Sequence, residues 1–171
     1  MTLVLIGYMG SGKSVIGQSL ANTLQLDYLD LDDYIQSKEN KSISEIFRSN
    51  GEIYFRKKES EYLHQILSKE NAVISLGGGT PCYAKNMGAV LDSKTTSIYL
   101  RATVKTLSDR LFPERRKRPL IAHLQTEEEL LEFVGKHLFE RSNFYEQCHY
   151  TVDTNGKSVE SVVDEIKTVL G

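Results

Sequence analysis

Short runs of apolar residues alternate along the chain with stretches in which apolar residues recur at helical spacing. The runs are four to eight residues long and rich in Val, Ile, Leu and Tyr, which is typical of buried strands. Strands that alternate with helices indicate an α/β fold built on a parallel sheet. The predicted strands are residues 2–6, 26–33, 72–76, 96–100 and 150–153.

The segments between these strands carry helix patterns and helix start signals. Ile16, Leu20 and Leu24 follow one another at four-residue spacing, which places them on one helix face. Ser42 followed by Glu45 forms a capping box, and Thr126 precedes three glutamates that suit a helix N-terminus. The predicted helices are one from Lys13, one from Ser42, Glu52 to Ser68, Ala84 to Leu91, Val104 to Leu111, one from Thr126, and Val159 to Leu170.

Residues 112–125 interrupt this alternation with about 14 residues that have no periodic pattern. A loop of this length is usually functional or disordered, so a mobile lid and a segment without function both stay open. The loop also concentrates positive charge, although the whole chain has a formal net charge of -2. Like charges repel, so we expect this cluster to face a negatively charged ligand. The cluster is Arg115, Arg116, Lys117 and Arg118, between Pro113 and Pro119.

Composition places the chain among ordinary globular proteins. Its 171 residues predict a single domain over residues 1–171, and 40% hydrophobic with 26% charged residues suits such a domain. No apolar run approaches the roughly 18 residues that span a bilayer, and the first residues lack the basic start of a signal peptide. Cys82 and Cys148 form no CxxC motif, so we expect two thiols in a reducing cytoplasm. The spacing of the four histidines predicts no His/Cys metal site.

The segment Gly7–Ser14, GYMGSGKS, carries the strongest chemical signal. It fits G-x-x-x-x-G-K-[ST] and lies between a predicted strand and a predicted helix, as this motif requires. Its glycines let backbone N–H groups approach phosphate, and the helix N-terminus adds positive potential. Lys13 reaches the β- and γ-phosphates, and the Ser14 hydroxyl ligates Mg²⁺. The motif therefore predicts that the protein binds a nucleoside triphosphate.

Other motifs narrow the class of nucleotide-binding protein. A regulatory GTPase needs Asn-Lys-x-Asp, and the NKSI at Asn40 lacks the aspartate. An ATPase that drives conformational work usually carries an acid at the end of an apolar strand, where this chain has Ser75. A small-molecule kinase fits better, because a compact chain with a lid excludes water from the transferred phosphoryl group.

Two acids and two arginines are candidates for binding the phosphoryl acceptor. Asp30 and Asp32 are two apart in a predicted strand end, so both would face the ligand crevice at the carboxyl edge of the sheet. One acid would hold Mg²⁺ through water and the other would contact the attacking hydroxyl. We expect Asp33 to cap the following helix, and a share of this role for Asp32 stays open. Arg56 and Arg141 each fit an ordinary surface arginine when taken alone. Together with the acids they suit a polyhydroxylated substrate that carries a carboxylate.

A glycine triplet, Gly77, Gly78 and Gly79, follows the third predicted strand directly. Such a triplet is either a plain turn or a place where a ligand approaches the backbone closely, and three glycines in a row favour the second interpretation.

Taken together, these motifs resemble the shikimate kinase family over essentially the whole chain. GYMGSGKS resembles the family's phosphate loop, and YLDLDDYI resembles its D-x-D stretch. FRKKE matches F-R-x-x-E, and SLGGG matches the S-x-G-G-G that replaces an ordinary Walker B motif. RPLI resembles the lid sequence R-P-L, and ERSNFYE resembles R-x-x-x-Y. The family fold would be a three-layer P-loop kinase with a five-stranded parallel sheet in the order 2-3-1-4-5.

The resemblance implies a role for each matching residue on the acceptor side. Arg56 and Arg141 would bind the carboxylate of shikimate, and Asp32 would bind its hydroxyl groups. Glu59, one helical turn after Arg56, would orient that arginine, and Ser75 would support the site without touching substrate. The implied substrate-binding residues are Asp32, Arg56, Gly77, Gly78, Gly79 and Arg141.

The nucleotide side follows in the same way. Lys13 and Arg118 would stabilise the charge on the transferring phosphoryl group, so the basic cluster belongs to a lid that closes over ATP. Ser14 would ligate Mg²⁺ directly and Asp30 through water, while Arg110 would lie over the adenine. The implied ATP-binding residues are Gly10, Ser11, Gly12, Lys13, Ser14, Val15, Arg110 and Arg118, and the implied catalytic residues are Lys13, Asp32 and Arg118.

The implied reaction is phosphoryl transfer from ATP to the 3-hydroxyl of shikimate, in the pathway to chorismate and the aromatic amino acids. We expect a cytoplasmic monomer with one Mg²⁺ per active site and no nucleic-acid or membrane partner. The chain departs from the family at Gly156 and Lys157, where an arginine and a proline are common. A kinase of gluconate or of a nucleoside monophosphate, and a non-catalytic ATP-binding regulator, stay open as alternatives.

Overall fold

The protein is built on one five-stranded parallel sheet with the strand order β2-β3-β1-β4-β5, seen in a computed structural model that describes residues 1–171. Every neighbouring pair of strands runs parallel, which confirms the predicted sheet and its order. Because β1 lies at the centre, the segment that follows it emerges in the middle of the sheet's carboxyl edge. The strands are β1 Thr2–Ile6, β2 Asp27–Asp30, β3 Ala72–Ser75, β4 Thr96–Arg101 and β5 Tyr150–Asp153.

Seven α-helices and two 3-10 helices connect and cover the strands. Their starts agree with the capping signals: Ser42 and Thr126 each form a complete capping box, with Glu45 and Glu129. The helices are α1 Lys13–Leu24, α2 Leu31–Glu39, α3 Ile43–Leu67, η1 Thr80–Cys82, α4 Asn86–Asp92, α5 Val104–Leu111, η2 Phe112–Lys117, α6 Glu127–Tyr145 and α7 Val159–Leu170.

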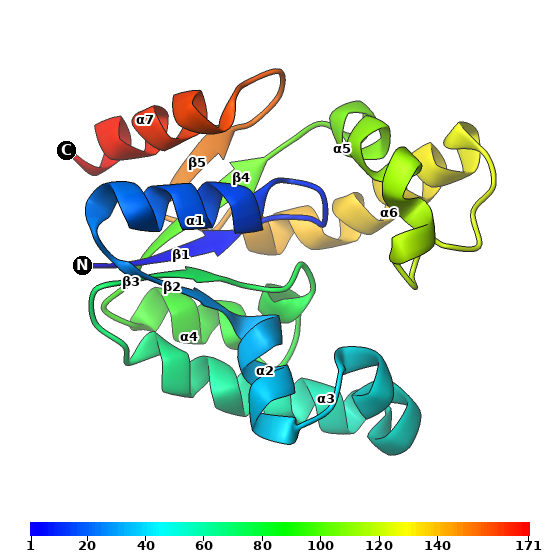
Figure 1. Ribbon diagram of the computed structural model, residues 1–171, viewed down its shortest axis with the longest axis horizontal. Helices are drawn as coiled ribbons and strands as arrows, with labels where there is room; N and C mark the ends of the chain where they lie inside the picture. The colour runs from blue at the N-terminus through cyan, green and yellow to red at the C-terminus, as the bar shows by residue number, and fades with distance from the viewer.

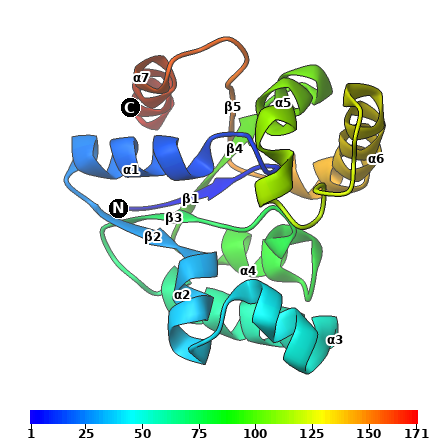
Figure 2. The same ribbon diagram turned by 45° about the vertical axis from the view of Figure 1, so that its right-hand side comes forward.

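The helices lie on both faces of the sheet and make a three-layer arrangement (Figures 1 and 2). Helices α1 and α7 cover one face, while α3 and α4 cover the other. In Figure 1, α5 and the start of α6 lie beyond the carboxyl ends of the strands, and η2 follows α5 directly. Helix α2 and the first half of α3 lie on the other side of this carboxyl edge from α5. No helix is both long enough and apolar enough to cross a membrane.

Alternation along the strands divides the core into two clusters, one on each face of the sheet. Leu3 and Leu5 of β1 pack with the cluster that contains α1 and α7. Val4 and Ile6 belong to the cluster on the opposite face, formed with α3, α4 and α6. Successive side chains of a strand point to opposite faces, so a fully apolar β1 is what a sheet covered on both sides requires.

The structure corrects the prediction at the end of the second strand. β2 ends at Asp30, and α2 begins at Leu31, so Asp32 lies in the first helical turn rather than in the strand. Asp30 is the helix cap, because its Oδ1 accepts a hydrogen bond of 3.2 Å from the backbone N–H of Asp33. The prediction that Asp33 caps this helix was wrong.

Gly51, whose φ of 85° and ψ of 173° are not helical, separates residues 43–67 into two helical segments, which confirms the two helices predicted from Ser42 and from Glu52. The structure differs from the prediction in two further places. Ala84 and Lys85 have positive φ angles, which delays the start of α4 to Asn86. The predicted loop over residues 112–125 begins with η2, which continues directly from α5, so only its second part is non-helical.

Candidate active site

The phosphate loop, Gly7–Ser14, joins β1 to α1 at the centre of the sheet's carboxyl edge. Gly10 and Gly12 have φ angles of 81° and 94°, in the left-handed region that favours glycine. Lys13 is the first residue of α1, and its Nζ donates hydrogen bonds to the carbonyls of Gly7 at 2.7 Å and Tyr8 at 3.0 Å. Backbone carbonyls of the loop therefore hold the lysine ammonium.

The surroundings of Lys13 lower the pKa of its side chain. Burial of the ammonium is the main cause that lowers the pKa of Lys13 from 10.5 to about 8, and the charges of Arg118 and Arg141 act in the same direction. The carboxylates of Asp32 and Asp30 act in the opposite direction. Charged side chains from three other segments thus converge on the lysine of the phosphate loop, as is typical of a functional site.

Asp30 and Asp32 stay close to each other although a helix begins between them. Burial is the main cause that raises the pKa of Asp32 from 3.8 to about 6, and the neighbouring charge of Asp30 acts in the same direction. Burial also raises the pKa of Asp30, against the hydrogen bond from the Asp33 backbone. The predicted acid pair is therefore present, with Asp30 at the strand end and Asp32 on the helix.

The glycine triplet is the point where the acid and both arginines meet. A Cβ atom added to Gly77 would lie 3.2 Å from Asp32 Oδ1. One added to Gly79 would lie 3.0 Å from Arg56 Nη2 and 3.2 Å from Arg141 Nη2. Side chains would have to move the charged groups away, so the glycines are needed because charged groups approach the backbone closely here. This geometry supports the close-approach interpretation rather than a plain turn.

Arg56 is held on α3 by contacts on several sides. Its Nη1 donates to Glu59 Oε1 at 2.8 Å, as the spacing predicted, and Glu59 is 1% exposed. The other carboxylate oxygen of Glu59 accepts a hydrogen bond of 2.8 Å from Thr80 Oγ1. The guanidinium carbon lies 3.9 Å from the ring centroid of Tyr83, a cation–π contact. Arg56 Nε is buried without a hydrogen-bond partner and lies 3.9 Å from Glu52 Oε1, so the terminal nitrogens are the part of the guanidinium that lies next to the glycine triplet.

Arg141 reaches the same place from α6, so guanidinium groups from two helices meet beside Gly79. A Cβ atom on Gly78 would lie 3.1 Å from Arg141 Nη1 and 3.5 Å from the Gly7 carbonyl oxygen. Gly78 therefore lies between this arginine and the phosphate loop. One turn further along α6, the Tyr145 hydroxyl donates a hydrogen bond of 2.5 Å to the Gly78 carbonyl.

Ser14 and Asp30 can serve as oxygen donors for Mg²⁺. Ser14 is exposed at the start of α1, beside the phosphate loop. Asp30 uses one carboxylate oxygen to cap α2 and keeps the other free. No cluster of three His, Cys, Asp or Glu residues could enclose a metal ion. Mg²⁺ suits such a sparse protein donor set, because it keeps several waters and shares phosphate oxygens of its substrate.

Ser75 and Arg110 support the phosphate loop from two sides. The Ser75 hydroxyl donates a 3.2 Å hydrogen bond to the carbonyl of Lys13, which joins the end of β3 to the start of α1. The Arg110 guanidinium donates to the Gly10 carbonyl at 3.1 Å and to the Thr154 carbonyl at 2.8 Å. Arg110 thereby links the phosphate loop to the segment after β5.

Val15 and Ser11 complete the predicted nucleotide-binding residues of this segment. Val15 is 58% exposed on the first turn of α1, an unusual position for a large aliphatic side chain. Ser11 is buried, and its hydroxyl has no hydrogen-bond partner.

The basic cluster between Pro113 and Pro119 divides into residues with different contacts. Arg115 Nε donates to the Leu124 carbonyl at 3.0 Å, and its Nη1 donates to the Phe112 carbonyl at 2.9 Å. Its guanidinium also lies 4.0 Å from the Phe112 ring centroid, so Arg115 holds the two ends of residues 112–124 together. Arg118 is half-buried, and its charge acts on Lys13.

Sequence reasoning missed several side chains around the site. Tyr8, Thr80, Tyr83 and Arg115 were given no role, and Tyr145 was seen only as part of a motif. Each acts through a contact with a residue on another segment, such as Tyr83 with Arg56. The spacing of Tyr145 from Arg141, one helical turn, is the only signal in the sequence that points to any of these contacts.

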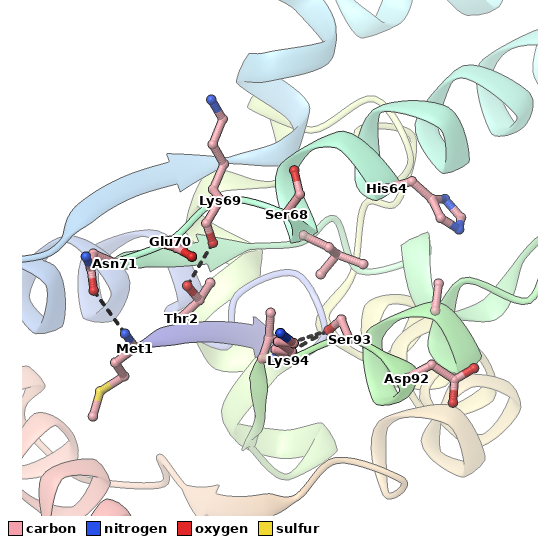
Figure 3. Close-up of a pocket in the computed structure, with 13 residues that line it drawn as sticks. Met1, Thr2, His64, Ser68, Lys69, Glu70, Asn71, Asp92, Ser93 and Lys94 are labelled. Atoms are coloured by element: carbon pink, nitrogen blue, oxygen red, sulfur yellow. Dashed lines mark hydrogen bonds between the residues drawn. The ribbon is translucent and has the colours of Figure 1, made fainter.

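A cavity of about 900 Å³ lies away from this site, at the opposite edge of the sheet. It is lined by residues that begin or precede strands, such as Thr2 and Asn71, and by the ends of α3 and α4 (Figure 3). The amino group of Met1 donates a hydrogen bond of 3.0 Å to Asn71 Oδ1 at its margin. No residue of the phosphate loop lines it, so it is separate from the candidate active site.

Comparison with known proteins identifies the family of this chain. The sequence profile described as Shikimate kinase matches residues 9–171. The chain belongs to the shikimate kinase family. A shikimate kinase of Flavobacterium johnsoniae is 47% identical over 169 residues, which cover 98% of each chain.

Solved structures of the shikimate kinase family agree with the fold over the whole chain. The enzyme from Bacteroides thetaiotaomicron superposes with a TM-score of 0.91 at 32% identity, covering 99% of this chain and 98% of its own. The enzyme from Acinetobacter baumannii, determined in complex with shikimate, gives a TM-score of 0.86 at 29% identity, covering 99% and 92%. The resemblance inferred from short motifs is therefore confirmed.

Proposed function

We propose that this protein transfers the γ-phosphoryl group of ATP to the 3-hydroxyl of shikimate. Membership of the shikimate kinase family makes it an ATP-dependent small-molecule kinase of the pathway to aromatic amino acids. The observation that carries the acceptor assignment is the convergence of two arginines and an acid on the glycine triplet, next to the phosphate loop. Shikimate is a polyhydroxylated carboxylate and offers both kinds of group.

The arginines bind the carboxylate in this proposal. Arg56 and Arg141 come from two different helices, and their Nη2 atoms would lie 3.0 and 3.2 Å from a Cβ atom added to Gly79. Nη1 of Arg56 would lie 3.2 Å from the same Cβ atom, so both guanidinium groups face one place. A planar carboxylate can accept from both guanidinium groups at once, which fixes its orientation as well as its position.

Asp32 orients the acceptor hydroxyl. With a pKa of about 6 its carboxylate is mainly ionised near pH 7 and accepts the hydrogen bond of the 3-hydroxyl. The hydroxyl oxygen attacks the γ-phosphorus, the bond to the bridging oxygen of ADP breaks, and the hydroxyl proton leaves for Asp32 or solvent. Because the transition state is loose, orientation contributes more than base strength.

Lys13 and Arg118 neutralise charge on the transferring phosphoryl group. The Lys13 ammonium donates to two carbonyls of the phosphate loop, and phosphate oxygens of ATP would take the place of these acceptors. Residues 112–125 act as a lid that brings Arg118 over the nucleotide. Gly10, Ser11, Gly12, Ser14, Val15 and Arg110 complete the proposed ATP site.

Mg²⁺ is held by the Ser14 hydroxyl directly and by Asp30 through water in this proposal. When bound, the ion neutralises phosphate charge and orients the triphosphate. We further propose that the protein works as a cytoplasmic monomer whose only partners are shikimate, ATP and Mg²⁺.

The proposal is tested by measuring ADP release with ATP and Mg²⁺ in the presence of no acceptor, shikimate, gluconate or AMP. We expect release that depends on shikimate alone. Release with gluconate or AMP would overturn the acceptor assignment while keeping the phosphate-loop assignment. Binding of ATP without release under any condition would favour a regulator.

A matched pair of variants connects this assay to the site. Arg56→Met removes a guanidinium that lies at the glycine triplet, whereas Arg48→Met removes an exposed arginine elsewhere on α3. We expect Arg56→Met to raise the KM for shikimate by ~10²-fold, because a paired carboxylate loses a charge-assisted contact. Arg48→Met should leave it unchanged.

A further inference from the structure

Helix α6 presents three polar side chains at four-residue spacing: His137, Arg141 and Tyr145. Residues four apart lie on the same face of a helix, so the proposed substrate arginine is flanked on both sides. On one side, the Tyr145 hydroxyl is bonded to the Gly78 carbonyl at 2.5 Å. On the other side, His137 Nδ1 lies 3.0 Å from the hydroxyl of Tyr8.

Tyr8 belongs to the phosphate loop, so its contact with His137 of α6 joins the proposed nucleotide site to the proposed acceptor site. Its side chain is 1% exposed, and its ring lies 5.8 Å from the guanidinium of Arg141. Its backbone carbonyl accepts the hydrogen bond from Lys13. One residue thus contacts the lysine of the nucleotide site and the arginine of the acceptor site.

The charges around the Tyr8–His137 hydrogen bond favour a neutral pair. Burial and the charge of Arg141 lower the pKa of His137, which favours the neutral imidazole. Burial raises the pKa of Tyr8 to about 12, so the phenol keeps its proton. We assign the phenol as the donor to Nδ1, which places the imidazole proton on Nε2. The rings of Tyr8 and Phe133 pack edge-on against the imidazole, with centroids at 5.6 and 5.3 Å.

We propose that the Tyr8–His137 hydrogen bond is a positioning contact that fixes Arg141 relative to the phosphate loop. The proposal rests on the function proposed above, because it assigns Arg141 to the acceptor. A small shift of α6 along its axis would move Arg141 away from Gly78 and Gly79, while Lys13 would stay with its loop. Tyr8 and His137 hold the helix from the nucleotide side, and Tyr145 holds it from the glycine triplet.

Three variants separate a positioning role from a purely structural one. Tyr8→Phe keeps the ring and removes the donor, and His137→Leu removes the acceptor. His137→Asn retains an acceptor near the place of Nδ1. We expect the first two to raise the KM and the calorimetric Kd for shikimate about fivefold, the effect of losing one ordinary hydrogen bond. The KM for ATP should change less than about twofold, and His137→Asn should recover most of the shikimate affinity.

Tyr34→Phe is the matched control. The Tyr34 hydroxyl donates to Gln65 Oε1 at 3.1 Å, a bond of similar length between side chains of α2 and α3. This bond is exposed, so its loss should lower thermal stability less than Tyr8→Phe does, and it should not change the affinity for shikimate.

The outcomes distinguish this proposal from the function on which it rests. If the unchanged protein neither binds shikimate nor uses it as acceptor, the proposed function is wrong and the positioning role falls with it. If the unchanged protein binds shikimate and Tyr8→Phe and His137→Leu bind it equally well, only the positioning role is wrong. A uniform rise in the KM values for both substrates would also overturn it, because it would indicate a general loss of structure.

Discussion

Lys13 and Asp32 are the residues whose protonation the site changes in opposite directions. The pKa of Lys13 is lowered from 10.5 to about 8, and the pKa of Asp32 is raised from 3.8 to about 6. Burial is the main cause of both shifts, because it removes water from the charged form of each side chain. The opposite charge of the other residue compensates for this loss only in part. Each residue serves a different substrate in the proposed reaction, so the two titrations should appear in different kinetic constants.

The pH dependence of the free enzyme follows from these two groups. The kcat/KM for shikimate should fall as pH decreases through about 6, because protonated Asp32 cannot accept the hydroxyl hydrogen bond. The kcat/KM for ATP should fall as pH rises through about 8, because neutral Lys13 loses its attraction for phosphate. Initial rates between pH 5 and 9 measure both. A common pH profile for the two substrates would contradict the separate assignments.

Arg118 should contribute to turnover rather than to acceptor binding. Arginines that stabilise a transferring phosphoryl group contribute ~10³-fold or more to rate, so Arg118→Ala should lower kcat by about that factor. The Kd for shikimate should change less than about threefold, since other arginines bind its carboxylate. Stopped assays and calorimetry provide the two values.

Arg116→Ala is the control for Arg118→Ala. Arg116 is exposed in the same cluster, two residues away, and should affect neither kcat nor shikimate binding. Equal small effects of Arg118→Ala on turnover and on binding would contradict its role in the lid.

At the scale of elements, α3 shows how one residue sets the shape of the acceptor side. Gly51 divides the helix with a φ of 85° and a ψ of 173°, so the part that carries Arg56 takes a new direction. This backbone region is accessible essentially to glycine alone. Without the break, the helix that begins at Ile43 would continue in its first direction, and Arg56 would not lie next to Gly79.

Replacing Gly51 by alanine should therefore be destabilising although space is available. No atom lies within 4 Å of a Cβ added at Gly51, so the cost is conformational strain of ~1–3 kcal/mol. Chemical denaturation should show this loss in the free energy of unfolding.

Gly88→Ala is the matched control, because a Cβ there also meets nothing within 4 Å. Gly88 lies in α4 with an ordinary helical backbone, so alanine should stabilise the protein by ~0.5–1 kcal/mol. Two glycine replacements in equally open space should thus change stability in opposite directions. Equal changes in both variants would show that the break at Gly51 carries no strain.

Helices and strands could be predicted from the sequence where the hydrophobic period extends over several residues. Their boundaries were predicted wrongly where the backbone conformation changes within a few residues. The apolar run of β1 and the capping boxes at Ser42 and Thr126 were sufficient to locate their elements. The start of α2 was misplaced because Asp30 both ends the strand and caps the helix. Residues 112–117 were expected to be a loop because their 3-10 turns bury no apolar side and leave no pattern to recognise.

At the scale of the whole molecule, the parallel sheet brings together segments that are far apart in the chain. The phosphate loop follows β1 and the glycine triplet follows β3, so both lie at the carboxyl edge of the sheet. Helices α2, α3 and α6 bring Asp32, Arg56 and Arg141 to the same place. Short motifs identified these residues one by one. Their contacts depend on how helices pack, so the bond between Tyr8 and His137, 129 positions apart, could not be predicted from sequence.

The central claim is that the phosphoryl group goes to the 3-hydroxyl of shikimate. The most direct test is a proton–phosphorus correlation spectrum of the product formed from ATP, Mg²⁺ and shikimate. We expect one new phosphorus signal coupled to the proton on carbon 3, in an amount equal to the ADP released. Coupling to the proton on carbon 4 or 5, or release of inorganic phosphate alone, would contradict the arrangement of Asp32, Arg56 and Arg141 around the acceptor.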